Sequence, residues 1–176
     1  GEAVANLDVV TGGSGAAIGL PENFRKAGLL SKRENVKPLA PVGGGGVVLS
    51  GSSSAATLAQ VAAMSAKHPA FAIDVAVLFS NKDKAIGEVL LWAVEKLKAS
   101  PTLIYASAPP EKVSEIQSRF GREKAGAVIE EAIAAIATGL AKSGVRRFVV
   151  AGGETSGAVV SALGVKALEI GPQISP

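Results

Sequence analysis

The chain carries the run Phe148-Val149-Val150-Ala151-Gly152-Gly153-Glu154-Thr155-Ser156-Gly157-Ala158-Val159-Val160. An apolar strand pattern ends there in two glycines, an acid and two hydroxyl residues, and an apolar helix pattern follows. Because glycine has no Cβ, the backbone of such a turn can lie close to a bound anion. The first turn of a helix also offers N–H groups that have no acceptor inside the helix. The run therefore predicts an anion site, with a nucleotide phosphate as its natural ligand, and leaves the reaction open.

Two other stretches follow the same plan of apolar strand, small-residue turn and helix start. They are residues 9–17, Val-Val-Thr-Gly-Gly-Ser-Gly-Ala-Ala, and residues 47–57, Val-Val-Leu-Ser-Gly-Ser-Ser-Ser-Ala-Ala-Thr. Their hydroxyl side chains could cap a helix or bind phosphate oxygens, and the sequence leaves both uses open. Glycine turns that serve only as tight corners of an α/β protein are the structural alternative.

Apolar strand patterns alternate with helical patterns, which predicts an α/β fold with three layers and a mostly parallel sheet. Ligands of such sheets bind at the carboxyl edge, where we expect the glycine-rich strand-to-helix turns. The segment 31–46, polar and then rich in proline and glycine, is the expected linker. Expected strands cover residues 7–10, 47–49, 70–78, 102–105, 147–151 and 167–170. Expected helices cover residues 16–20 (interrupted by Pro21), 55–66, about 82–98 (capped by Asn81 or a neighbour), 109–121, 122–142 and 156–163.

The composition bounds the class of protein. Hydrophobic residues make up 48% of the 176 positions and charged residues 19%, which is typical of one buried domain, alone or with a fragment of another. A net charge of +3, spread evenly, argues against a nucleic-acid partner. The chain has no cysteine, and neither a membrane span nor a signal peptide is recognisable, so we expect a cytoplasmic protein without a membrane partner. Both ends look cut, and we expect the chain to be part of a longer protein.

Several catalytic and binding motifs are absent from the sequence. There is no P-loop and no dinucleotide fingerprint, and Ala16 stands where the elbow of a serine nucleophile would need glycine. His68 is the single histidine and lies at an expected helix end, which argues against a Ser-His-Asp triad and excludes a His/Cys metal site. Magnesium held by phosphate and one carboxylate is compatible with the sequence, with Glu154 the best-placed acid. The alternative for Glu154 is an acid that the helix dipole favours.

Four stretches, taken together, are more specific than any one turn. They are Val10-Thr11-Gly12-Gly13-Ser14-Gly15 with Gly19-Leu20-Pro21, Ser50-Gly51-Ser52-Ser53-Ser54-Ala55-Ala56-Thr57 with Gln60-Val61, Val150–Val159 with Ala162-Leu163-Gly164-Val165, and Ile170-Gly171-Pro172-Gln173-Ile174-Ser175-Pro176. In these stretches the chain resembles the four-carbon acid sugar kinase family, and the likeness covers nearly its whole length. One departure is Ser53, where the family usually has cysteine. The family's acidic motif near the N-terminus and a late Lys-Ser-Gly-Asn-Phe-Gly-like segment are also missing from this sequence.

The resemblance implies two domains. Residues 1–38 would be the end of a substrate-binding domain with a linker, and residues 39–176 a nucleotide-binding domain that is incomplete at its C-terminus. The resemblance also implies ATP and, with it, Mg²⁺. The cofactor-binding residues that it implies are Ser52 or Ser54 in one turn, and Gly152, Gly153, Glu154 and Thr155 in the other.

The reaction implied by the resemblance is transfer of the γ-phosphoryl group of ATP to the terminal C4 hydroxyl of a four-carbon sugar acid, namely 3-oxo-tetronate, threonate or erythronate. No catalytic residue and no protein metal ligand is assigned, because neither a base nor a clamp for the sugar carboxylate is visible in the sequence. A non-catalytic sensor of a nucleotide or phosphometabolite is the alternative, since the turns contain neither histidine nor lysine. The sequence leaves a homo-oligomer open.

Overall fold

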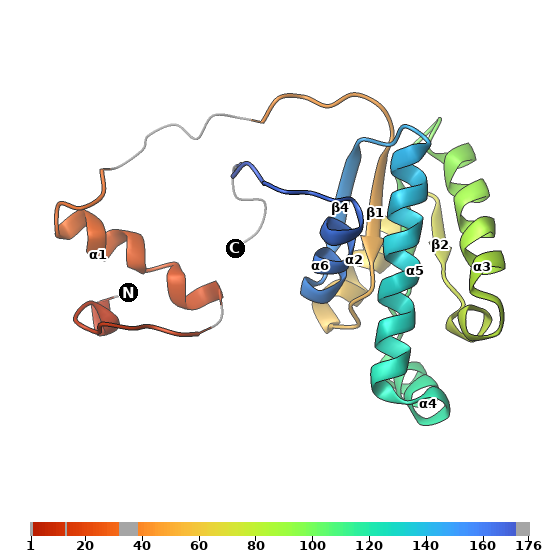
Figure 1. The fold of residues 1–176 in the computed structure, drawn as a ribbon, viewed down its shortest axis with the longest axis horizontal. Coiled ribbons are helices and arrows are strands. Elements are labelled where there is room, and N and C mark those ends of the chain that lie inside the picture. The colour runs from red at the N-terminus through yellow and green to blue at the C-terminus, as the bar shows by residue number, and fades with distance from the viewer. Residues whose placement is uncertain (1, 13, 32–38, 172–176) are drawn as a thin grey trace. The chain divides into compact units, whose positions relative to one another are not determined.

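The computed structural model describes residues 2–12, 14–31 and 39–171. Contacts divide the chain into two compact units (Figure 1), one of residues 41–168 and one of residues 1–40 with 169–176. The predicted assignment of residues 1–38 to a substrate domain and of 39–176 to a nucleotide domain stays a prediction, because contacts define compact units and not functions.

The larger unit is built on a sheet of four parallel strands in the order β2-β3-β1-β4. Leu49 of β1 lies opposite Ile104 of β3 on one side and Val150 of β4 on the other. The predicted parallel α/β sheet is therefore confirmed. The strands are β1 (Gly46–Ser50), β2 (Ala70–Ala72), β3 (Thr102–Tyr105) and β4 (Arg147–Ala151).

Helices cover both faces of this sheet, which gives the three layers that the sequence predicts (Figure 1). The connection from β1 to β2 runs toward one edge of the sheet, and the connections from β2 to β3 and from β3 to β4 run toward the other edge. Because such crossovers are right-handed, α2 lies on one face of the sheet, and α3 and α5 lie on the opposite face. α6 packs beside α5, and α4 lies next to the first turns of α5. The helices are α2 (Ala55–Ser65), α3 (Val75–Lys96), α4 (Pro110–Phe120), α5 (Arg122–Lys142) and α6 (Gly153–Ala162).

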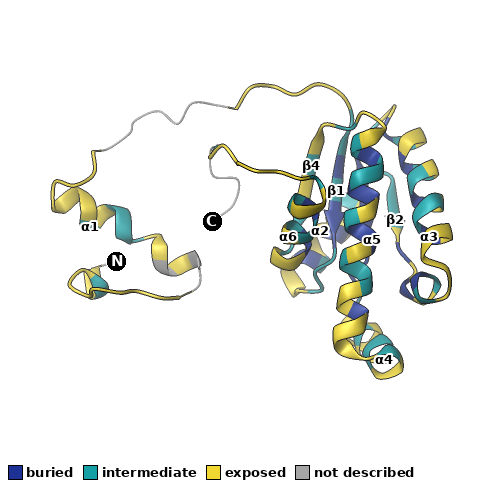
Figure 2. Ribbon diagram, viewed as in Figure 1, coloured by how far each residue is buried: buried dark blue, intermediate teal, exposed yellow. Residues whose placement is uncertain are grey.

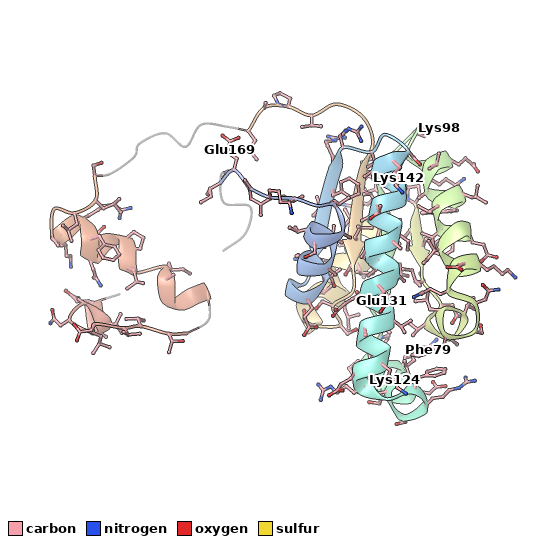
Figure 3. All side chains as sticks on the ribbon, viewed as in Figure 1. Phe79, Lys98, Lys124, Glu131, Lys142 and Glu169 are labelled. Atoms are coloured by element: carbon pink, nitrogen blue, oxygen red, sulfur yellow. The ribbon has the colours of Figure 1, made fainter. Side chains whose placement is uncertain are left out.

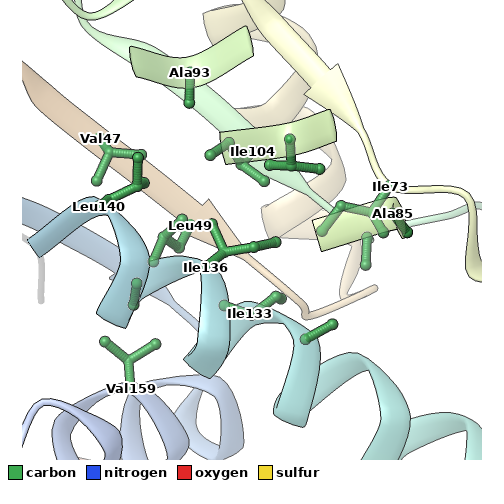
Figure 4. Packing of buried hydrophobic residues seen from close by; sticks show 14 of the residues in the cluster. Val47, Leu49, Ile73, Ala85, Ala93, Ile104, Ile133, Ile136, Leu140 and Val159 are labelled. Atoms are coloured by element: carbon green, nitrogen blue, oxygen red, sulfur yellow. The ribbon is translucent and has the colours of Figure 1, made fainter. Parts of the chain in front are cut away.

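The core lies between the sheet and the two helices α3 and α5 (Figure 4). It is aliphatic, as the aromatic content of 4% predicts. Buried residues lie on β1, α3 and α5 (Figure 2). On the opposite face of the sheet, α2 buries Thr57 and Val61. Side chains at most 2% exposed in the core are Val47, Leu49, Val89, Ala93, Ile104, Ala132, Ile133, Ile136, Ala137, Leu140 and Val159.

The start of α3 corrects one predicted strand. The strand expected over residues 70–78 ends at Ala72, and residues from Val75 onward are helical. The reason is Asp74, whose carboxylate accepts hydrogen bonds from the N–H groups of Ala76 (2.8 Å) and Val77 (3.3 Å) and so caps the helix. The predicted cap at Asn81 is confirmed: its backbone is non-helical (φ −157°, ψ 81°), and its side chain accepts from the N–H of Lys84.

The smaller unit contains two short 3₁₀ helices, η1 (Glu2–Val4) and η2 (Ser14–Ala17), and the helix α1 (Leu20–Lys26). Pro21 lies in the first turn of α1, so it begins a helix rather than interrupting one. The strand predicted over residues 7–10 is wrong, and Val9 is 83% exposed.

The strand predicted over residues 167–170 is also wrong, and Ile170 is 91% exposed. In both segments an apolar pattern has no neighbouring strand to pair with among the described residues. Residue 13, part of the linker (32–38) and the end of the last resembling stretch (172–176) lie outside the described residues. Over the part of the chain that the structure describes, none of the helices has both the length and the apolar character needed to cross a bilayer.

Candidate functional site

A cleft of about 930 Å³ opens at the carboxyl edge of the sheet. One wall consists of the turns after β1 and β4, and the other consists of α4 and the first turns of α5. Two of the three glycine turns that the sequence singles out therefore meet in one site. The third, residues 11–15, belongs to the smaller unit.

The turn after β4 brings bare backbone to the cleft. Gly152 has φ +111°, a conformation that favours glycine, and it directly precedes α6. A Cβ at Gly152 would lie 3.1 Å from the Cβ of Ser52, so the two turns are closely packed. α6 begins at Gly153, three residues earlier than predicted, and no side chain caps it. Glu154 and Thr155 therefore lie in its first turn, whose N–H groups have no acceptor within the helix.

Thr155 is the best-defined polar group of the cleft. The residue is 4% exposed and lines the cleft, yet its hydroxyl has no hydrogen-bond partner among the described residues. A Cβ at Gly51 would lie 2.5 Å from the Thr155 Oγ1 and 3.3 Å from the Cδ1 of Ile133. Gly51 thus provides the space that this hydroxyl occupies. Sequence reasoning selected Thr155 but missed Gly51, although Gly51 stands in one of the quoted turns.

The serine turn after β1 contributes residues of two kinds. Ser52 and Ser53 line the cleft, and the Ser53 hydroxyl accepts a hydrogen bond from the N–H of Ala108 in the loop after β3 (3.3 Å). Ser54 is not among the cleft residues. Its hydroxyl accepts from the N–H of Thr57 (3.2 Å) and bonds the Thr57 hydroxyl (2.9 Å), which makes it the cap of α2. Of the two serines that the resemblance offers, Ser52 is the one at the cleft.

The second wall of the cleft was missed by sequence reasoning. The charged residues on it are Arg122, Glu123 and Glu130, and Gly126 leaves bare helix surface between them. The only local signal was Gly121, which turns the chain between α4 and α5 with φ +86°. With Glu154 opposite, the cleft has three carboxylates and one guanidinium.

α4 is fixed in place by aromatic packing. The ring of Phe120 at its end stacks on that of Phe79 of α3 at 3.9 Å, with 4° between the ring planes (Phe79 is labelled in Figure 3). Ile116 lines the cleft from one side of α4 and also lines a second cleft, of about 680 Å³, next to it. α4 therefore separates two adjoining clefts at this edge of the sheet.

No ready-made metal centre accompanies the site. Over the described ranges, no group of three or more His, Cys, Asp or Glu residues is placed to hold a metal ion. Glu154 is exposed at the cleft and offers one carboxylate, which fits a Mg²⁺ ion whose other ligands are phosphate oxygens and water. His68 lies at the opposite edge of the sheet, where its Nδ1 is 3.1 Å from the Ser100 hydroxyl, so it cannot act in the cleft.

A parallel sheet whose glycine turns and helix start face a cleft is the arrangement typical of a phosphate-binding α/β domain. Residues 47–176 match the family described as "Nucleotide-binding C-terminal domain", and the chain belongs to this family. The resemblance to the four-carbon acid sugar kinases is also confirmed, since several curated relatives are 3-oxo-tetronate kinases.

Two relatives and one solved structure indicate the degree of similarity. The 3-oxo-tetronate kinase of Burkholderia multivorans is 52% identical over 176 residues, which are the whole of this chain and 41% of the relative. That of Escherichia coli is 41% identical over 178 residues, covering 100% of this chain and 45% of the relative. A crystal structure of a Haemophilus influenzae protein matches with a TM-score of 0.77 and 39% identity, over 99% of this chain and 41% of that one. The chain thus spans about two fifths of the length of these proteins.

Proposed function

We propose that the chain is the ATP-binding part of a kinase that transfers the γ-phosphoryl group of ATP to the terminal C4 hydroxyl of a four-carbon sugar acid. The name of the relatives favours 3-oxo-tetronate as the acceptor. Threonate and erythronate are the other acceptors to test. Phosphoryl transfer depends mostly on positioning and on charge stabilisation, so the part that binds the donor supplies much of the catalytic effect.

The observation that carries this proposal is the Thr155 hydroxyl. The Thr155 side chain is 4% exposed, and its hydroxyl has no partner among the described residues. The oxygen is open to water in the cleft, because among the described residues Thr102 Oγ1, and not Thr155 Oγ1, is the enclosed side-chain oxygen without a partner. A donor that only water satisfies, in the first turn of a helix beside two glycine turns, is available to a ligand. A phosphate oxygen in the cleft would accept from this hydroxyl and from the first-turn N–H groups of α6. A purely structural corner needs no such arrangement.

The predicted binding residues in the cleft have different roles in binding ATP. Gly152 and Gly153 expose backbone to the phosphates, and Ser52 adds a hydroxyl from the neighbouring turn. Glu154 would contribute a carboxylate oxygen to Mg²⁺, which when bound neutralises charge on the phosphates. The cytoplasm supplies both ATP and Mg²⁺ and is the location we propose, with no nucleic-acid or membrane partner.

A matched pair of glycine variants tests ATP binding. A Cβ at Gly153 or at Gly157 would meet no atom within 4 Å, so Gly153→Val and Gly157→Val both leave the fold intact. Both residues lie in α6, but only Gly153 lines the cleft. In the full-length protein, titration calorimetry should show MgATP affinity reduced by at least about 10-fold in Gly153→Val and unchanged in Gly157→Val. Equal affinities in the two variants would contradict the proposal.

A turnover assay separates the kinase from the sensor. Coupled detection of ADP with 3-oxo-tetronate, threonate and erythronate should show release that depends on the acceptor. Tight binding of MgATP with no ADP release for any four-carbon sugar acid would instead establish a non-catalytic nucleotide sensor.

A further inference from the structure

The charges of the cleft single out one residue that the proposed function does not use. Of the charged side chains lining the cleft, Glu123, Glu130 and Glu154 are acidic and Arg122 is basic. Although carboxylates line the same cleft, Arg122 makes no hydrogen bond or ion pair with any residue that the structure describes. Its side chain is exposed and its five donors are free.

The position of Arg122 is electrostatically unfavourable in the protein alone. It is the first residue of α5, where the helix dipole disfavours a cation, and no side chain caps this helix. Across the cleft, Thr155 is 4% exposed as a residue, and its hydroxyl, which is open to water, also lacks a protein partner among the described residues. One anion lying between the two walls would satisfy both groups.

We propose that Arg122 binds the polyphosphate chain of the nucleotide from the α5 side of the cleft, opposite the glycine turns. This inference rests on the proposed function, because it assigns a further binding residue to the same donor. A guanidinium forms two parallel charge-assisted hydrogen bonds to phosphate oxygens, which an ammonium cannot do. Arg122 then supplies the positive charge that the glycine turns after β1 and β4 lack.

The test compares Arg122→Gln with Lys124→Gln in the full-length protein. Lys124 lies in the same helical turn and carries the same charge, but it is not among the cleft residues (Figure 3). Affinities are measured for MgATP, for magnesium tripolyphosphate and for adenosine. Circular dichroism melting checks that both variants stay folded, as exposed side chains predict.

We expect Arg122→Gln to weaken MgATP and tripolyphosphate by about 10- to 100-fold and to leave the affinity for adenosine unchanged. Lys124→Gln should leave all three affinities within about twofold of wild type, since Lys124 does not line the cleft and the field of an exposed charge is screened by salt. Arg122→Gln binding MgATP as tightly as wild type would overturn the inference, as would an equal loss in both variants. Failure of the wild-type protein to bind MgATP would instead refute the proposed function.

Discussion

Replacing Thr155 by valine should stabilise the free protein and weaken ligand binding. The side chain is 4% exposed, and valine keeps its shape while removing the unpartnered hydroxyl. A polar group left without a partner costs about 1–3 kcal/mol when it is fully enclosed, and the Thr155 hydroxyl oxygen is not fully enclosed. Because the residue lines the cleft, water reaches part of this group, so we expect a gain of about 1 kcal/mol in the free energy of unfolding. Bound nucleotide reverses the sign, because a hydrogen bond to a charged phosphate contributes about 1.5–3 kcal/mol, or about 10- to 150-fold in affinity.

Urea unfolding measures both effects on the same samples. Trp92 is the only tryptophan of the chain and packs edge-on against Phe71 at 5.2 Å, so its fluorescence reports unfolding of this unit. Thr155→Ser is the control: it keeps the hydroxyl, loses a buried methyl at a cost of about 1 kcal/mol, and should retain MgATP affinity. A Thr155→Val protein that is less stable than wild type and binds MgATP normally would refute the reasoning, because the hydroxyl would then serve the fold.

Other predictions concern the fold around the site. Gly51→Ala should lower the free energy of unfolding by about 1–3 kcal/mol, because its Cβ would collide with the stiff, β-branched side chain of Thr155. Gly87→Ala is the control, because its Cβ would lie in open space within α3, and it should raise the free energy of unfolding by about 0.5–1 kcal/mol. The same urea titration measures both variants. Leu140→Ala removes a fully buried core side chain and should cost about 2–5 kcal/mol. The hydrogen bond to Glu131 (2.8 Å) raises the pKa of Lys82 above its usual 10.5, so this pair stabilises the fold below pH 10.5 and stops doing so as pH rises through the raised value. Lys82→Gln should therefore melt closer to wild type at about pH 12 than at about pH 8.

The sequence predicts three of the four strands and the glycine turns for a clear physical reason. A buried parallel strand must be apolar throughout, and the chain can leave it sharply only through small residues, so both features are visible locally. Residues 47–49, 102–105 and 147–151 carry this signal, and the structure has strands there. The apolar segments 7–10 and 167–170 carry it too, but among the described residues they have no strand beside them. A strand forms only where it can pair with a neighbouring strand, and a local sequence pattern does not show whether such a neighbour is present.

The second wall of the cleft has no comparable local signal. Arg122, Glu123 and Glu130 look like any solvated face of a helix, because charges at that spacing are common on exposed surfaces. They become part of a site only because α4 and the first turns of α5 stand beside the carboxyl edge of the sheet. Asp74 is missed for a similar reason, since one capping carboxylate decides between a longer strand and a new helix. The second wall depends on tertiary packing, and the start of α3 depends on a single side chain, so a local sequence pattern shows neither of them.

The two turns that meet in the cleft look alike in sequence but differ in what they leave unsatisfied. α2 is capped by its own chain, because the Ser54 hydroxyl accepts from the N–H of Thr57. α6 follows Gly152, which has no side chain to act as a cap, and the hydroxyl of Thr155 in its first turn is unpartnered among the described residues. The hydroxyl of the turn before α2 is therefore used within the fold, whereas the N–H and hydroxyl donors at the start of α6 are available to a ligand. A helix that begins without a cap, beside a hydroxyl that has no protein partner, is stabilised when an anion binds, so we expect ligand binding and the stability of α6 to be coupled.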